Sequence, residues 1–250
     1  MLFRRKTHTH GGHIRYMQTL KGVVTMLRDP YHTESVFDIE DGLREIPAYE
    51  KSLEFVRADP GIRSLMDSRY LAPAADVQAL SRCADGTLGK VYANHIIDNG
   101  FDADYFRKIE VKTDLDWMLM RIRQTHDIWH VVTGLGVGPF GELGLKSFEL
   151  SQTRRPMAAI ITTGGVIRYL LHTPEELGET LDYIAYGYRL GNEAKPFLAQ
   201  RWEERWDEPL TELRRALDVH PDEIPYAVET IPPTSAAETL DEAPPQEVDV

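Results

Sequence analysis

The chain has 250 residues, enough for one large domain or two small ones. Hydrophobic residues make up 42% and charged residues 27%, which are ordinary values for a globular protein with a sizeable core. The formal net charge of -12 argues against a general nucleic-acid binder, because attraction to phosphate requires a basic surface. We therefore expect no nucleic acid among its partners.

The charge is unevenly distributed along the chain. Residues 1–28 contain lysines and arginines but no carboxylate, whereas no lysine or arginine follows Arg215. Residues 1–13 resemble a flexible basic leader. Residues 219–250 combine prolines and acids with too few apolar residues to offset the entropy of ordering. We predict a helical domain over residues 14–218, followed by a disordered, acidic, proline-rich tail.

The first expected helix covers residues 14–27, where apolar residues recur every three or four positions. They are Ile14, Met17, Leu20, Val24 and Leu27. This helix either packs on the core or touches an anionic membrane surface, and the lack of any acid before Asp29 keeps the second alternative open.

Cys83 is the only cysteine, so no intramolecular disulfide forms, which fits a reducing compartment.

Further helices are predicted at residues 34–58 and 59–71, and Thr87 is expected to cap another that runs through His95. The clearest helix covers residues 114–133, and a glycine-rich connection follows it. Helices are then expected at residues 142–153, 157–171, 174–199 and 200–217. Alternation typical of strands is scarce, so the predicted fold class is all-α, with a single multi-helix domain. No stretch reaches the roughly 20 apolar residues of a membrane span.

The predicted helix over residues 114–133 carries the chemistry. Leu115, Leu119, Ile122, His126 and His130 step by three or four positions, so they line one face. The face starts apolar and ends in two imidazoles, which therefore point inward. Two histidines at positions i and i+4 can bind one metal ion, although they can also be core histidines with hydrogen-bond partners.

Carboxylates near the histidine pair favour the metal-binding alternative. Asp127 lies about 100° around the helix from His126, at the border of the face. Glu142 follows the glycine-rich connection, and a chain reversal there returns its carboxylate to the histidines. His126, His130 and Glu142, with Asp127 as a further candidate, thus form a predicted site for one divalent ion. Nitrogen and oxygen ligands suit zinc, iron, manganese or cobalt.

The same residues resemble the signature of the coenzyme Q (ubiquinone) biosynthesis family Coq4. That signature is His-Asp-x-x-His-x11-Glu, and His126, Asp127, His130 and Glu142 match every defined position. Three further segments are similar, at residues 80–96, 185–206 and 209–214. The resemblance covers about residues 14–218 and omits the acidic tail.

The resemblance implies an all-helical protein that binds a divalent metal at the motif and supports ubiquinone synthesis. Its members are described as organising biosynthetic enzymes at a membrane. They are also assigned the oxidative decarboxylation at ring carbon 1 of polyprenylated 4-hydroxybenzoate intermediates. The short leader favours a bacterial member, cytoplasmic and peripheral to the inner membrane; a eukaryotic member would lie on the matrix side of the mitochondrial inner membrane.

Carried over to this chain, the family's metal site falls on His126, Asp127, His130 and Glu142. Asp127 has two open roles: it ligates the metal, or it orients water or moves a proton as a catalytic residue.

The expected substrate is an aromatic acid with a long isoprenoid tail, and the expected partners are other ubiquinone biosynthesis proteins. A homodimer is compatible with the sequence, although no residue indicates one. No dinucleotide fingerprint is visible, so we expect no bound flavin or nicotinamide.

Three functions remain open at this point. The first is a metal-dependent oxidative decarboxylase. The second is a non-catalytic, lipid-binding scaffold in which the metal is structural. The third is a hydrolase like the His-Glu-x-x-His peptidases, which is disfavoured because Asp127 is shorter than the glutamate it replaces. For the isoprenoid tail, the candidate lining is residues 157–171 and the stripe of Leu115, Leu119 and Ile122, although each of these residues is more readily explained as core.

Lys146, Arg154 and Arg155 lie near the site in sequence. They either meet the substrate carboxylate or form a solvated helix face, and we expect the solvated face.

Overall fold

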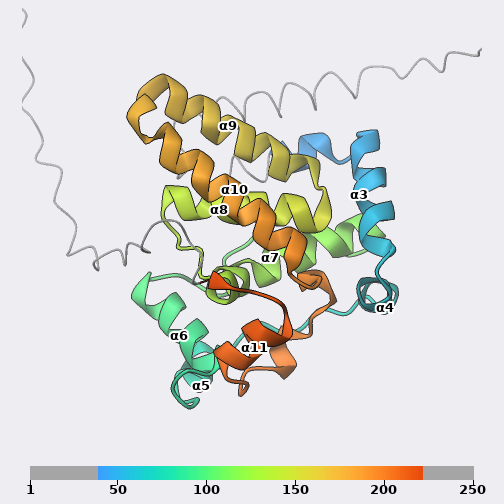
Figure 1. Cartoon of the computed structure of the whole chain (residues 1–250). Coiled ribbons are helices and arrows are strands. Elements are labelled where there is room, and N and C mark those ends of the chain that lie inside the picture. Colours follow the sequence, from blue (N-terminus) through green and yellow to red (C-terminus); the bar gives the residue numbers. More distant parts are fainter. Residues whose placement is uncertain (1–38, 222–250) are drawn as a thin grey trace, which may run out of the picture.

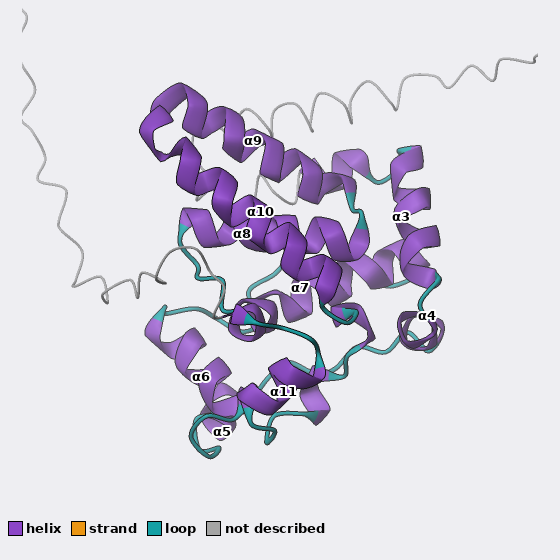
Figure 2. Cartoon of the chain, in the orientation of Figure 1, coloured by secondary structure: helices purple, strands orange, loops and turns teal. Residues whose placement is uncertain are grey.

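A computed structural model describes residues 39–221 of the chain, and its regular elements are helices. Figure 2 shows this all-helical body, which confirms the predicted fold class. The only extended pairing within residues 39–221 is an isolated bridge between Thr87 and Pro209. The predictions for the leader, for the helix at residues 14–27 and for most of the acidic tail lie outside the described residues.

The central element is α7 (Asp114–Thr133), which has helices on both sides (Figure 1). On one side lie α8 (Pro139–Thr153), α9 (Pro156–His172) and α10 (Leu177–Glu193). On the other side lie α5 (Val77–Leu80), α6 (Leu88–Asp98) and α11 (Leu210–Ala216). The remaining elements are α3 (Pro47–Arg57), α4 (Pro60–Asp67), η1 (Pro174–Glu176), η2 (Phe197–Ala199) and η3 (Trp202–Glu204).

The ends of α7 are set by local sequence. Thr113 and Asp116 form a capping box, in which each side chain binds the other's backbone N–H. At the other end Gly134 adopts a left-handed conformation with φ 76°, which glycine reaches without steric penalty. The Arg214 side chain then donates hydrogen bonds to the carbonyl oxygens of Val131 and Val132, both at 2.9 Å. These contacts hold the end of α7 that carries both histidines.

Helices α8 and α10 cross at very close range because glycines meet at the crossing. A Cβ atom added to Gly187 would lie 2.0 Å from the carbonyl oxygen of Gly144. A side chain larger than hydrogen at Gly187 would therefore force the two helices apart. The crossing fixes α8, whose first turn contains Glu142, against the rest of the domain.

Helix α6 is attached to the segment that precedes α11. The backbone N–H groups of Leu88 and Gly89 donate to the carbonyl oxygens of Glu208 and Trp206, at 2.9 and 2.8 Å. Thr87 caps α6 by accepting from Lys90 N–H at 3.4 Å, as predicted. Together these bonds fix α6 beside α7, with His95 near His130 and Tyr92 near Asp127.

Several predicted helix boundaries are wrong, and proline explains most of the errors. The helix expected at residues 34–58 is interrupted at residues 44–46, because Pro47 disfavours helical backbone at the residue before it. The helix expected at residues 174–199 ends at Glu193, three residues before Pro196. The helix expected at residues 200–217 forms only in its last part: η3 and a loop come first, and α11 starts only after Pro209.

The ordered body extends slightly beyond the predicted boundary at residue 218. Val219 is buried, and its backbone N–H donates to the Arg214 carbonyl at 2.9 Å. No helix among the described residues is both long and apolar enough to cross a membrane.

Candidate metal centre

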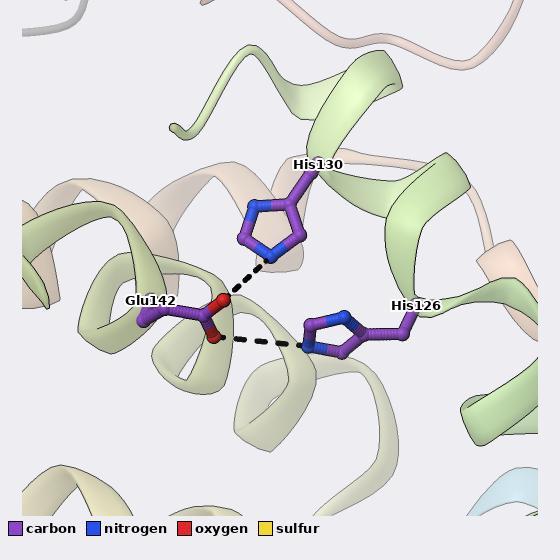
Figure 3. Close-up of side chains that lie close together, drawn as sticks. All are labelled: His126, His130 and Glu142. Carbon is purple, nitrogen blue, oxygen red and sulfur yellow. Dashed lines mark hydrogen bonds and ion pairs between the residues drawn. The ribbon is translucent and has the colours of Figure 1, made fainter. Parts of the chain in front are cut away.

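His126 and His130 lie one turn apart on α7 and direct their imidazoles to the same side (Figure 3). His130 is buried, at 2% exposure, and the side chain of His126 is 26% exposed. The Nδ1 atom of His130 lies 2.8 Å from the carbonyl oxygen of Leu135, just past the Gly134 turn. That bond places a hydrogen on Nδ1 and leaves Nε2 as a potential ligand atom.

Glu142 reaches the histidines from the first turn of α8. The connection folds tightly: a Cβ on Gly141 would lie 2.0 Å from the Gly136 carbonyl oxygen, so glycine is required there. Glu142 Oε1 lies 3.1 Å from Nε2 of His130, and Oε2 lies 3.8 Å from Nε2 of His126 (Figure 3). The carboxylate therefore faces both imidazoles at once.

Three of the four predicted ligands thus converge. One ligand atom each from His126, His130 and Glu142 lies within 4.8 Å of the others. This is a donor set of two nitrogens and one carboxylate oxygen, which suits a divalent ion such as zinc, iron, manganese or cobalt. Glu142 is 39% exposed, so another molecule can reach the group from solvent.

His130 and Glu142 stabilise each other's charged form. Partial burial alone would raise the pKa of Glu142, but the positive charge and hydrogen bond of His130 lower this pKa well below its usual range. Burial likewise opposes the protonated form of His130, yet the Glu142 carboxylate raises the pKa of His130 above its usual value. Without an ion, the pair is therefore held together by a shared proton and opposite charges.

Asp127 lies beside the group and is not one of its members. Its Oδ1 atom is 3.4 Å from Nδ1 of His126, on the ring edge opposite the nitrogen that faces Glu142. Burial raises the pKa of Asp127, but the hydrogen bond and charge of His126 lower it further, so the net shift is downward. Of the two roles left open by the sequence, this position favours orienting His126 over binding the ion directly.

Two residues of α6 also border the centre, and sequence reasoning gave neither a role there. The ring of His95 stacks on His130, with centroids 6.0 Å apart and an interplanar angle of 23°. Burial, and then the charge of His130, lower the pKa of His95. Tyr92 is buried one turn earlier, and burial and the Asp127 carboxylate raise its pKa. The only sequence signal for Tyr92 and His95 was that they lie three positions apart, which places both on one face of the predicted helix.

The cations expected on a solvated face have other positions. Arg155 is buried at 3% exposure and pairs with Glu149 and Glu40, while Lys146 contacts Glu149 at 3.2 Å. The expectation is therefore wrong for Arg155. Arg154 is exposed and lies over the Phe55 ring, 3.9 Å from its centroid. The contacts described for these three side chains lie away from the histidine pair, although the charge of Lys146 contributes to the low pKa of Glu142.

The apolar stripe expected to line a tail cavity is mainly core. Leu119 and Ile122 are buried within the main hydrophobic cluster, and Leu115 packs against it. An open groove of about 580 Å³ lies elsewhere, between α5, α6 and the loop that follows α6. Apolar residues line much of it: Ala74, Ala75, Val77, Ile96, Ile97 and Phe101.

The fold and the side-chain group together define a helical protein with a candidate single-ion centre of two histidines and a glutamate. The model of the family described as coenzyme Q (ubiquinone) biosynthesis protein Coq4 matches residues 15–223. The chain belongs to this family, which takes part in ubiquinone biosynthesis, and the resemblance noted in the sequence is confirmed.

Individual relatives agree with the family match. The chain is 29% identical to a mitochondrial ubiquinone biosynthesis protein COQ4 homologue of Anopheles gambiae, over 69% of this chain and 62% of that protein. It is 29% identical to the corresponding homologue of Danio rerio, over 78% of this chain and 73% of that protein. The chain thus spans less than two thirds of the mosquito relative.

A solved structure shares the fold. It is the crystal structure of a Nostoc punctiforme protein provisionally assigned to ubiquinone biosynthesis. Its TM-score is 0.73 with 30% sequence identity, and the match covers 81% of this chain and 97% of that one.

Proposed function

We propose that this protein is a metal-dependent enzyme of ubiquinone biosynthesis that replaces the carboxylate at ring carbon 1 of a polyprenylated 4-hydroxybenzoate with a hydroxyl group. The observation that supports this proposal is the convergence of His126, His130 and Glu142 within the family signature. Such a centre supplies Lewis-acid stabilisation of charge that develops on the substrate, and it leaves coordination positions open.

The reaction has a simple balance. The bond between ring carbon 1 and the carboxyl carbon breaks, its electron pair stays on the ring, and carbon dioxide leaves. Carbon 1 then gains one oxygen atom from dioxygen. The second oxygen atom becomes water with two protons and two electrons from an external reductant. Dioxygen and a two-electron donor are therefore required co-reactants.

The chain's own residues have separate roles in this proposal. His126, His130 and Glu142 would hold the ion, and the Leu135 carbonyl keeps the His130 ring oriented. Asp127 orients His126 and is the carboxylate placed to accept or return a proton beside the ring nitrogens.

The groove beside α6 offers a place for the apolar tail. Phe101 lines the groove, and its ring meets His95 edge to face at 5.9 Å. His95 in turn stacks on His130. In this proposal the head of the substrate lies at the metal centre and its tail runs past Phe101 toward the open groove. The packing of Phe101 on His95, and of His95 on His130, supports an amphiphilic substrate.

We further propose that the protein acts at a membrane surface together with other ubiquinone biosynthesis proteins, on the cytoplasmic side if it is bacterial. Leu170 and Leu171 at the end of α9 are 54% and 70% exposed, and Leu181 of α10 is exposed nearby. Exposed apolar side chains at the end of a helical hairpin favour contact with lipid or with a partner. The names of the curated relatives describe them as mitochondrial proteins. The cytoplasmic side is our proposal for this chain.

The proposal is tested by product analysis. Purified protein loaded separately with zinc, iron, manganese or cobalt receives a short-chain prenylated 4-hydroxybenzoate, air and ascorbate, and mass spectrometry follows the products. His130→Ala should lose both metal and turnover. Asp127→Asn should stay folded, retain metal and leave the carboxylated substrate unchanged. His172→Ala, at an exposed histidine at the end of α9, is the matched control and should react like the parent protein.

The same experiment distinguishes the enzyme from the alternative, a non-catalytic scaffold. Loss of the carboxylate with gain of a hydroxyl only in proteins with an intact centre supports the enzyme. Substrate that binds but stays unchanged with every metal would favour a lipid-binding scaffold with a structural ion.

A further inference from the structure

His95 has one nitrogen without a hydrogen-bond partner at the edge of the metal centre. Its Nε2 atom is shut off from solvent, and no donor or acceptor within residues 39–221 meets it. The ring is packed between His130, at 6.0 Å, and Phe101, at 5.9 Å. The polar atom is thus held beside the proposed ligands while its ring is fixed by aromatic neighbours.

An unsatisfied nitrogen in such a place requires an explanation. Buried polar atoms in folded proteins nearly always have a partner, since losing contact with water without gaining a hydrogen bond is unfavourable. The ring has little freedom to turn outward, because α6 is bonded to the segment at residues 206–208 and Tyr92 packs on Trp206 with centroids 5.2 Å apart. The fold therefore maintains the unsatisfied atom.

We propose that Nε2 of His95 hydrogen-bonds an oxygen atom of the aromatic acid that binds at the metal centre. This inference rests on the proposed function and adds a substrate-contacting residue to it. A histidine N–H is a good donor to a carboxylate or phenolate oxygen, and hydrogen bonds to charged acceptors are the stronger ones. The position also suits the substrate path, since Phe101 joins His95 to the apolar groove.

Direct binding of the ion by His95 agrees less well with the geometry. The ligand atoms that lie within 4.8 Å of one another come from His126, His130 and Glu142, and His95 contributes none. Its ring is stacked on that of His130, with an interplanar angle of 23°. His95 is therefore placed to contact a molecule that approaches the centre from the α6 side.

Cobalt provides a test that does not depend on turnover. The visible spectrum of Co²⁺ reports first its binding to the protein and then the arrival of an added oxygen ligand. The full chain is titrated with Co²⁺ and then with 4-hydroxybenzoate, benzoate or phenol. The variants are His95→Phe, which keeps a ring without a donor, His95→Gln, which keeps an amide donor, and His172→Gln as an exposed histidine control.

We expect His95→Phe to bind Co²⁺ as the parent does but to bind 4-hydroxybenzoate on the order of ten- to a hundredfold more weakly. His95→Gln should recover most of that loss, and His172→Gln should match the parent. The same loss with benzoate identifies the carboxylate as the acceptor, and the same loss with phenol identifies the phenolic oxygen.

Other outcomes would overturn the inference. Unchanged affinity in His95→Phe makes His95 a core histidine, and lost Co²⁺ binding in that variant makes it a ligand or a structural residue. Either result leaves the proposed function standing. If the parent protein binds no Co²⁺, or binds it without any spectral response to the three aromatic probes, the proposed metal-dependent function fails together with this role of His95.

Discussion

At the scale of single residues, the candidate metal centre would couple proton binding to ion binding. Glu142 raises the pKa of His130 above its ordinary value, whereas Glu142 itself stays ionised because its pKa is lowered. An ion can bind His130 only through the neutral imidazole, so it must displace this proton. His126, Asp127 and His95 surround the same site, and their charges enter the same balance.

We therefore predict that affinity for Zn²⁺ or Co²⁺ falls as the pH drops through the raised pKa of His130, by roughly tenfold per pH unit for one displaced proton. Calorimetry in two buffers with different ionisation enthalpies should detect release of that proton. The metal-free protein should show the opposite trend. The contribution of His130 to stability is fully present below its unfolded pKa and is lost as the pH rises through its folded pKa. Proton-independent binding across this range would contradict the proposed ligand pair.

At the scale of elements, the crossing of α8 and α10 positions Glu142 and should tolerate no added methyl group. Gly187→Ala would bring a Cβ within 2.0 Å of the Gly144 carbonyl oxygen, so backbone must move. We predict a loss of about 1–3 kcal/mol in the free energy of unfolding, as for other overpacked sites, together with weaker metal binding.

Gly178→Ala is the matched control in the same helix, because nothing lies within 4 Å of its added Cβ. It should be neutral or stabilise the protein by up to about 1 kcal/mol. Chemical unfolding and a metal titration of both variants measure the two effects. Equal stability of the two alanine variants would show that the crossing relaxes easily.

The elements that were predictable from sequence are those whose ends have local signals. Residues 114–133 form α7 as predicted, because a capping box starts it and a left-handed glycine ends it. The helices expected over residues 174–199 and 200–217 have wrong boundaries, because the prediction continued the apolar spacing across Pro196 and Pro209. Spacing within the helix placed His126 and His130 on one face, and the glycine-rich connection after it predicted the return of Glu142 to that pair. His95 and Tyr92 were missed because their role depends on how α6 packs against α7, which local spacing does not encode.

The hairpin of α9 and α10 gives a prediction for membrane contact. Exchanging Leu170 and Leu171 together for glutamate replaces two exposed apolar side chains with charges. Each leucine buried in lipid contributes on the order of 1.5–3 kcal/mol, so binding to phosphatidylcholine vesicles should fall at least tenfold. Tyr105→Glu, at an apolar residue that is 67% exposed on the loop after α6, is the matched control. Co-sedimentation that is unchanged in the double variant would exclude this end of the hairpin as the contact.

At the scale of the whole molecule, stability comes from packing away from the metal centre. A single hydrophobic cluster joins residues from α3 to α11, including the buried side chains of Trp117, Trp129 and Trp202. A buried network of charges adds specific links: Arg123 and Arg155 both bind Glu40, and Arg155 also binds Glu149. These contacts connect the helix at residues 39–43 with α7, α8 and α9 and include none of the proposed ligands.

The domain should therefore remain folded when the ion is removed, which separates a catalytic centre from a structural one. After treatment with a chelator, we expect circular dichroism to retain its helical signal and thermal unfolding to stay cooperative. Restoring metal at about a hundredfold over its Kd should stabilise the fold by roughly 2.7 kcal/mol, a rise of several degrees in Tm. His130→Ala should abolish this rise without unfolding the protein. A metal-free protein that loses its helices would instead assign the ion to folding, as in small zinc domains, and would favour the scaffold over the enzyme.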